Sequence, residues 1–353
     1  MICVFGRFLS IEIGSQNIKI VECERKGKNI IIHKSVMVRT PRNSINDGII
    51  INIISIKEVI KKVLHDKKIK CKSVIFTSRS TSIITRIITI PFSKQSEMQS
   101  IVKYQMQHYL PINFDEYIVE FVLLEKFNQE DVQKARVRVV VYPKDMAEKY
   151  LELAKTLKLT PVCLDINYNC ITKLLCNNFS KNTEGQFKNE TFATIDMGSD
   201  FLEFAVILNG KVEFTRIISS GGSYIDGDIS RQIGLHIEDA EIRKIENCDL
   251  SIEQYDDGNK EFINNIIKSI VDDWIREIKK FVDYYNNNNK NNNIKSIYIY
   301  GGSSKLKGID VYMANLLNIP VSVLNNIDNI NFKEHNLKHS IFYLNNIGSF
   351  IRL

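Results

Sequence analysis

The sequence predicts a mixed α/β protein made of two lobes, and three observations support that class. The chain has 353 residues, which is more than one ordinary domain needs. Its composition, 44% hydrophobic and 25% charged, is typical of a globular protein. One strand–turn–strand pattern occurs twice, at residues 11–22 and again at 195–206. Two copies in one chain indicate two lobes.

The repeated pattern reads apolar, acid, apolar, Gly, Ser, followed by a second apolar run. The acid and the turn are Glu12 and Gly14-Ser15 in the first copy, and Asp196 and Gly198-Ser199 in the second. Each copy fits a strand, a tight turn and a returning strand. A carboxylate beside a glycine turn suits a bound phosphate with its metal ion. The pair of hairpins therefore predicts two lobes that hold one nucleotide.

The first lobe continues with the order strand, helix, strand, strand. β-Branched runs bounded by polar turns predict strands at 30–38, 73–77 and 83–90. Helical spacing predicts a helix at 56–64. The resulting βββαβ order resembles one half of a doubly wound α/β unit.

A small α+β block interrupts this lobe after Pro91. A helix is predicted from Ser96 until Pro111 stops it. Strands are predicted at 117–124 and 137–142, with a polar turn at 127–134 between them, and a second helix at 145–157. The block therefore spans residues 89 to about 163.

Residues 164–180 predict a helix that returns to the first lobe, and the polar stretch 181–190 predicts the link to the second. After the second hairpin come a strand at 211–218, a helix opened by Gly221-Gly222 and a long amphipathic helix at 261–285. The Asn-rich stretch 286–293 predicts a solvated loop. A strand at 297–300 runs into Gly301-Gly302-Ser303 and another helix; a last strand begins at 319, and a helix at 341–351 closes the chain.

Charge and cysteine usage narrow the class of protein. A net charge of +6 without a long Lys/Arg block permits contact with an acidic surface but does not indicate a nucleic-acid binder. Seven cysteines without a Cys-x-x-Cys pair indicate a reducing compartment. No apolar run approaches the roughly 20 residues that span a bilayer, and the start lacks signal-peptide features. A cytoplasmic protein is expected.

Four glycine turns stand in order along the chain: Gly14-Ser15, Gly198-Ser199, Gly221-Gly222 and Gly301-Gly302-Ser303. Glycine lets backbone N–H groups approach a phosphate closely, and a helix that starts at the turn adds its dipole. Each turn alone also fits an ordinary connection between strands. Four turns, two of them with a preceding carboxylate, favour a phosphate site.

This order of motifs resembles the actin, sugar-kinase and Hsp70 superfamily, and more closely the PilM family of actin-like cytoplasmic proteins of type IV pilus assembly. The closer resemblance covers nearly the whole chain and includes the inserted block, which PilM shares with the division protein FtsA. It rests on the segments 109–112, 139–144, 150–153, 159–162 with Asp165, 215–216, 221–222, 234–235, 238–241 and 300–306.

The resemblance implies a two-lobed actin/Hsp70/sugar-kinase-like (ribonuclease H-like) α/β fold with an inserted α+β subdomain of the SHS2 type. Its subdomains would be 1A at 1–88, 164–190 and 339–353, 1C at 89–163, 2A at 191–222 and 294–338, and 2B at 223–293.

The resemblance also implies an ATP and Mg²⁺ site. The first phosphate turn would comprise Gly14, Ser15, Gln16, Asn17 and Lys19, where a strand lysine exposed to solvent is the other reading of Lys19. The second would comprise Asp196, Gly198 and Ser199, with Gly221 and Gly222 facing the phosphates. Glu241 and Lys244 would reach the ribose or base, or form only a solvated helix pair. Gly301, Gly302 and Ser303 would support the adenine, with Lys305 beside it. Glu12 and Asp196 would hold Mg²⁺ through water.

Two departures from the family pattern bear on hydrolysis. The family has Asp where this chain has Glu12, and small residues where it has Asp200 and Phe201. One methylene moves a carboxylate by about 1.5 Å, and a misplacement of about 1 Å can cost on the order of 10²-fold in rate. We therefore expect nucleotide binding with weak or absent hydrolysis, and no catalytic residue is assigned.

The implied function is that of a scaffold. ATP would hold the lobes closed, and a groove between 1A and 1C would take the N-terminal cytoplasmic peptide of a PilN-like membrane protein, which links the inner-membrane alignment complex to the pilus machinery. The protein would lie at the inner face of the membrane and touch it only through partners. Alternatives are a true ATPase, a sugar kinase, which requires a general base not found here, or an FtsA-like protein, whose membrane tail is not expected after Leu353.

Overall fold

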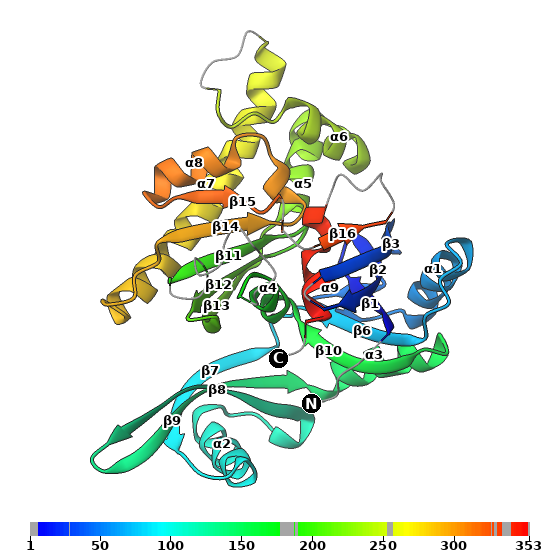
Figure 1. The fold of residues 1–353 in the computed structure, drawn as a ribbon. Helices are drawn as coiled ribbons and strands as arrows, with labels where there is room; N and C mark the ends of the chain where they lie inside the picture. The colour runs from blue at the N-terminus through cyan, green and yellow to red at the C-terminus, as the bar shows by residue number, and fades with distance from the viewer. Residues whose placement is uncertain are drawn as a thin grey trace. The chain divides into compact units, whose positions relative to one another are not determined.

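The computed structural model describes residues 6–27, 29–176, 187, 190–252, 257–325, 327, 330–333 and 340–351. It forms two compact units, one of Met1–Glu24 and Lys34–Asn167, the other of Arg25–His33 and Tyr168–Leu353 (Figure 1). Most of the link expected at 181–190 lies outside the described residues. The boundaries of the four subdomains stay a prediction.

A mixed sheet runs through the first unit in the order β10-β6-β1-β2-β3 and continues to β16 (Ile330–Phe332) beside the start of β3. Its strands are β1 (Arg7–Ile13), β2 (Asn17–Lys26), β3 (Asn29–Arg39), which begins in the second unit, β6 (Ser73–Ser78) and β10 (Thr160–Ile166). β1 and β2 form the expected antiparallel hairpin, and β6 runs parallel to both β1 and β10. Helices α1 (Ile53–Asp66) and α3 (Lys144–Thr156) share one apolar core with this sheet. The short strands β4 (Ile45–Asn46) and β5 (Ile49–Ile50) pair beside them.

Strand β10 corrects the expectation of a helix over 164–180. Residues Thr160–Ile166 pair with β6 along its whole length, with an irregularity between Pro161 and Cys163. Helix α4 begins only at Asn167 and is described to Cys176. Pro161 argues against a strand in the sequence, because proline has no N–H to donate to a neighbouring strand. It is tolerated here because it lies near the start of the strand, at an irregularity in the pairing.

The inserted block is a three-stranded antiparallel sheet in the order β7-β9-β8, packed on one helix. Its elements are β7 (Ile84–Pro91), α2 (Gln95–Tyr109), the short helix η1 (Phe114–Glu116), β8 (Tyr117–Gln129) and β9 (Val132–Pro143). The polar turn expected at 127–134 is wrong, because β8 and β9 continue through it as a long hairpin (Figure 1). The turn itself is Glu130-Asp131, both left-handed with φ of 51° and 61°, as a tight two-residue hairpin requires.

The second unit contains a five-stranded sheet in the order β13-β12-β11-β14-β15. Its strands are β11 (Phe192–Met197), β12 (Leu202–Leu208), β13 (Lys211–Ile218), β14 (Ser296–Tyr300) and β15 (Val321–Val323). Helices α5 (Gly222–Ile233), α6 (Ile237–Asn247), α7 (Gly258–Asn288) and α8 (Ile309–Leu317) contribute to its core, in which Trp274 is buried. Near the end of the chain lie η3 (Ser340–Tyr343) and α9 (Leu344–Ser349).

Three expectations for this unit need correction. The Asn-rich stretch is helical as far as Asn288, since the amides of Asn288 and Asn289 donate to the carbonyls of Tyr284 and Tyr285 and close the last turn. The strand at 321–323 is not the last, because β16 (Ile330–Phe332) pairs with the start of β3. The segment after Gly301-Gly302 first forms the short helix η2 (Ser303–Lys305) and only then α8.

Candidate functional site: two glycine hairpins

The first hairpin turn is held by backbone bonds and by one threonine. The Gly14 N–H donates to the carbonyl of Asn17 at 3.0 Å, and Thr40 donates its hydroxyl to the Gly14 carbonyl at 2.6 Å and its N–H to the Gln16 carbonyl at 3.0 Å. A Cβ on Gly14 would lie 3.0 Å from the Asn17 oxygen. The turn of Gly14, Ser15, Gln16 and Asn17 is therefore a fixed shape that favours glycine at its start.

Glu12 and Lys19 form an ion pair across this hairpin. They are directly opposite in the β1–β2 register, with Lys19 Nζ 2.8 Å from Glu12 Oε1. The two side chains are only 9% and 15% exposed, respectively. The second carboxylate oxygen of Glu12 is buried without a hydrogen bond. The lysine expected to face a phosphate is thus bound to the acid expected to hold the metal.

The second hairpin repeats the turn of the first. The Gly198 N–H donates to the Phe201 carbonyl at 3.0 Å, the same three-residue spacing as in the first copy. The carbonyls of Gly198 and Ser199 in this turn accept hydrogen bonds from residues far along the chain in the same unit. The Gly198 carbonyl accepts from Gly222 N–H at 3.0 Å and Ser303 Oγ at 3.2 Å. The Ser199 carbonyl accepts from the N–H and hydroxyl of Ser223, both at 2.9 Å.

Glycine is required at several of these contacts because the backbones approach so closely. A Cβ on Gly221 would lie 2.3 Å from the Ser199 carbonyl oxygen, and one on Gly222 would lie 2.5 Å from Ser303 Oγ. Gly301 has a φ of +92°, and a Cβ there would lie 2.6 Å from Asp196 Oδ1. The second, third and fourth glycine turns therefore meet in one cluster around the end of β11.

Asp196 in this cluster is oriented by a residue that the sequence did not indicate. Asn345 of α9 donates its amide to Asp196 Oδ2 at 2.8 Å, and its own carbonyl oxygen accepts from the Tyr300 hydroxyl at 3.1 Å. Asp196 and Asn345 are 5% and 2% exposed. No motif marked Asn345, because its partner lies 149 positions away.

Lys244 is also brought into the cluster, through a second residue that was missed. Its Nζ lies 2.7 Å from Asp226 Oδ1 and donates to the Gly222 carbonyl at 3.3 Å. The Lys244 and Asp226 side chains are 12% and 4% exposed. The only sequence signal for Asp226 was an acid next to Ile225 on the apolar face of α5. Glu241, one turn before Lys244 on α6, is half-buried.

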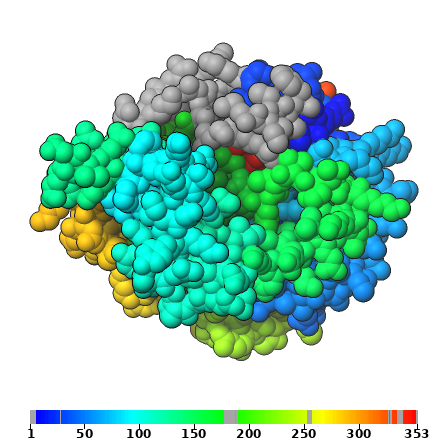
Figure 2. All heavy atoms as spheres, turned by 90° about the horizontal axis from the view of Figure 1, so that it is seen from below, coloured from blue at the N-terminus to red at the C-terminus, as the bar shows by residue number. Residues whose placement is uncertain are grey.

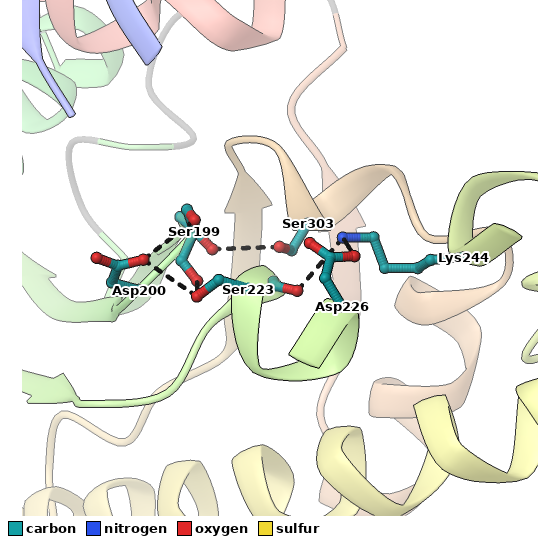
Figure 3. A network of polar contacts seen from close by, with 8 residues as sticks. Ser199, Asp200, Ser223, Asp226, Lys244 and Ser303 are labelled. Carbon is teal, nitrogen blue, oxygen red and sulfur yellow. Dashed lines mark hydrogen bonds and ion pairs between the residues drawn. The ribbon is translucent and has the colours of Figure 1, made fainter. Parts of the chain in front are cut away.

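Figure 3 shows the polar network that joins the second turn to the start of α5 and to η2. Asp200 accepts from the Ser199 hydroxyl at 3.1 Å, and the Ser223 hydroxyl, also at 3.1 Å, shares its single proton between Asp200 and the Ser199 carbonyl. Lys305 lies with its Nζ 4.8 Å from the centre of the Phe342 ring, and burial lowers the pKa of its ammonium. Gly302, which precedes η2, has open space around its Cα.

The predicted residues thus form two groups, one in each unit. Glu12, Lys19 and the first turn belong to the first unit, while Asp196 and the other turns belong to the second. In the described parts of the chain, no three His, Cys, Asp or Glu side chains gather as metal ligands. Nor does any helix described there have the length and apolar character to cross a membrane.

Comparison with known proteins assigns the family. The model of the family described as "Type IV pilus assembly protein PilM" matches residues 10–345. The chain belongs to the PilM family. Among solved structures, it is similar to the PilM-PilN type IV pilus biogenesis complex, with a TM-score of 0.83 at 18% identity, covering 98% of each chain.

Two further structures show how widely this fold is shared. The PilM-family chain is similar to the ethanolamine utilization protein EutJ from Carboxydothermus hydrogenoformans, with a TM-score of 0.59, 12% identity and coverage of 98% and 90% of the two chains. It is also similar to MreB 5 of Spiroplasma citri bound to AMPPNP, with a TM-score of 0.57, 12% identity and coverage of 98% and 95%. The expected actin-like α/β fold is confirmed.

Proposed function

We propose that this PilM-family chain is a nucleotide-binding scaffold of type IV pilus assembly. It docks the N-terminal cytoplasmic peptide of a PilN-like membrane protein at the inner face of the cell membrane. Family membership supports the pilus role. The similar structure of a PilM-PilN complex supports the partner, and the similar MreB 5 structure with AMPPNP supports a nucleotide.

The observation that carries the nucleotide site is the glycine cluster around Asp196. Three turns meet there with backbone so close that a Cβ at Gly221, Gly222 or Gly301 would overlap a neighbour. Glycine at these positions lets an anion approach the backbone closely, and the N-terminus of α5 at Gly222 adds its dipole. The residues therefore fit the phosphates of ATP.

The same cluster fits Mg²⁺ held through water. Asp196 has one carboxylate oxygen fixed by Asn345, which orients the carboxylate without removing its charge. Mg²⁺ keeps several waters and needs few protein carboxylates, so an incomplete set of acids suits it. When bound, the ion would neutralise phosphate charge. The protein's own contribution is to hold Asp196 in place through Asn345 and to place the dipole of α5 beside the phosphates.

The first hairpin supports binding more than hydrolysis. Glu12 is tied to Lys19 at 2.8 Å and so is not set as a freely directed carboxylate. A scaffold needs only that the bound nucleotide favour one conformation of the protein. The nucleotide shifts the conformational equilibrium by as much as its affinities for the two conformations differ.

A pull-down tests the scaffold role. The full chain is incubated with the immobilised N-terminal peptide of the pilus membrane protein encoded beside it, with a scrambled peptide as the control. In the presence of ATP and Mg²⁺, we expect the chain to be retained on the native peptide and not on the scrambled one. Equal retention on both peptides, or on neither, would count against the partner assignment.

A further inference from the structure

Helix α1 and the loop that follows it carry most of the net charge of the chain. Residues 57–72 include seven lysines and two carboxylates, Glu58 and Asp66, a net charge of +5 against +6 for all 353 residues. The lysines do not form an uninterrupted run, so the sequence alone does not mark them. The exposed ones are Lys61, Lys62, Lys67, Lys68, Lys70 and Lys72.

The structure places these lysines on helix α1 and on the turn and loop that follow it in the first unit. Helix α1 buries Ile56, Ile60 and Val63 in the core, so its opposite face is left to solvent. It is about 20 Å long at 1.5 Å per residue. A tight turn at Lys68, with φ of 51°, ends it and leads the remaining lysines directly to β6.

Two exposed isoleucines begin the same surface. Ile51 is 63% exposed and Ile54 is 65% exposed, and Ile54 shares the outer face of α1 with Lys61. Residues 51–72, which we call the α1 surface, therefore combine aliphatic side chains at one end with ammonium groups along the rest. The blue atoms of this segment lie at the right-hand edge of the molecule in Figure 2.

Lysine alone supplies the positive charge here, and this separates the possible polyanions. No Arg, Phe, Tyr or Trp occurs between residues 51 and 72. Nucleic acids are commonly held by arginine forks and by aromatic rings that stack on bases. A lipid surface requires only diffuse positive charge with a few aliphatic side chains at the headgroup boundary. The two acids, Glu58 and Asp66, are already included in the net charge of +5, so the segment stays strongly positive.

We propose that the α1 surface binds directly to a bilayer rich in anionic phospholipids. The choice of a membrane rests on the proposed function, in which the partner is a membrane protein. The contact adds to the attachment that the partner makes, and it raises the local concentration of the chain at the membrane. Each lysine near such a surface contributes about a fivefold change in binding.

Vesicle flotation tests this proposal with the full chain and without nucleotide or partner. Vesicles of equal phosphatidylglycerol and phosphatidylcholine are compared with vesicles of phosphatidylcholine alone, at about 0.1 M and about 0.5 M salt. We expect binding to the anionic vesicles at low salt only. Lys61→Glu, Lys62→Glu, Lys67→Glu and Lys70→Glu combined should reduce it by more than about 100-fold.

The matched control reverses four exposed lysines elsewhere, Lys260→Glu, Lys279→Glu, Lys290→Glu and Lys295→Glu. It makes the same change in net charge and should retain clearly more binding. Replacing the α1 lysines by Gln serves as a second variant if the reversals unfold the chain, as judged by circular dichroism. Binding of RNA but not of anionic vesicles, no vesicle binding, or equal loss in both variants would overturn the proposal. If the peptide pull-down succeeds while the vesicle experiment gives any of these results, the proposal for the α1 surface fails and the proposed function stands.

Discussion

At the scale of single residues, each of the two proposed phosphate sites contains a buried ion pair that holds a lysine. In the first unit, Glu12 holds Lys19, and in the second, Asp226 holds Lys244 beside the glycine cluster. Buried pairs of this kind stabilise little in themselves, because desolvation offsets their attraction, but an unpaired member is costly. Their main effect is therefore to keep two lysines in defined places.

Glu12→Gln should raise the affinity for ATP. The change removes a negative charge from the turn proposed to face the phosphates and frees Lys19 to approach them. We expect a several-fold lower Kd, within about tenfold, since one charge near a partly exposed site contributes about 1 kcal/mol. Isothermal titration against ATP measures it, with Glu58→Gln on the exposed face of α1 as the control. An unchanged or weaker affinity would remove the first hairpin from the phosphate site.

Lys244→Ala should destabilise the second unit by about 3 kcal/mol, because it removes the ammonium that pairs with the buried carboxylate of Asp226. The matched control, Arg231, lies on α5, the helix that carries Asp226. Arg231 pairs with Asp228, three residues away, and the Arg231 side chain is 77% exposed. Arg231→Ala should change the free energy of unfolding by less than about 0.5 kcal/mol. Urea denaturation compares the two variants, and similar losses would show that the Lys244 pair is not specially buried.

At the scale of elements, close backbone packing sets the junction between the second hairpin and α5. Gly221 can tolerate no Cβ, because the neighbouring atom is the backbone oxygen of Ser199. Gly227 lies in the middle of the same helix, and a Cβ there would meet nothing within 4 Å. A side chain is therefore excluded at Gly221 but has room at Gly227.

Opposite stability effects are expected from the same substitution at these two sites. Gly221→Ala should lower the free energy of unfolding by about 2 kcal/mol or more, because backbone must move. Gly227→Ala should raise it by about 1 kcal/mol, because alanine favours the helix. Thermal melts give both values. If Gly221→Ala proved neutral, the tight junction of α5 with the hairpin would be refuted.

The helices and strands also show how much of the secondary structure the local sequence pattern predicted. Strong periodicity predicted α1, α2, α3 and the hairpins to within a few residues. Strand β10 was missed because Pro161 interrupts its pattern, and the long β8–β9 hairpin was cut short because its exposed ends are polar. In both cases pairing with a neighbouring strand, which is not local, stabilises the extended backbone.

At the scale of the whole molecule, we expect the chain to bind ATP and to hydrolyse it only slowly. ATP with Mg²⁺ at a hundredfold excess over its Kd should stabilise the fold by about 2.7 kcal/mol through preferential binding to the native state. A thermal-shift assay with and without EDTA measures this. The absence of any shift at saturating ATP would contradict the nucleotide site.

Phosphate release gives the complementary measurement. We expect turnover well below about 1 s⁻¹, the low end of typical enzyme rates, because Glu12 is longer than the family's Asp and is tied to Lys19. Glu12→Asp should then increase the rate. Steady release above that value by the unaltered chain would favour a true ATPase.

The sequence by itself determined the class of the protein. The repeated hairpins, the four glycine turns and the inserted block are local patterns, and they were sufficient for the fold and the family. Only the tertiary structure decided which side chains meet. Asn345 reaches Asp196, Asp226 reaches Lys244, and Glu12 is bound to Lys19. The physical reason is that hydrogen bonds and ion pairs act over about 3 Å in space, whatever the separation along the chain.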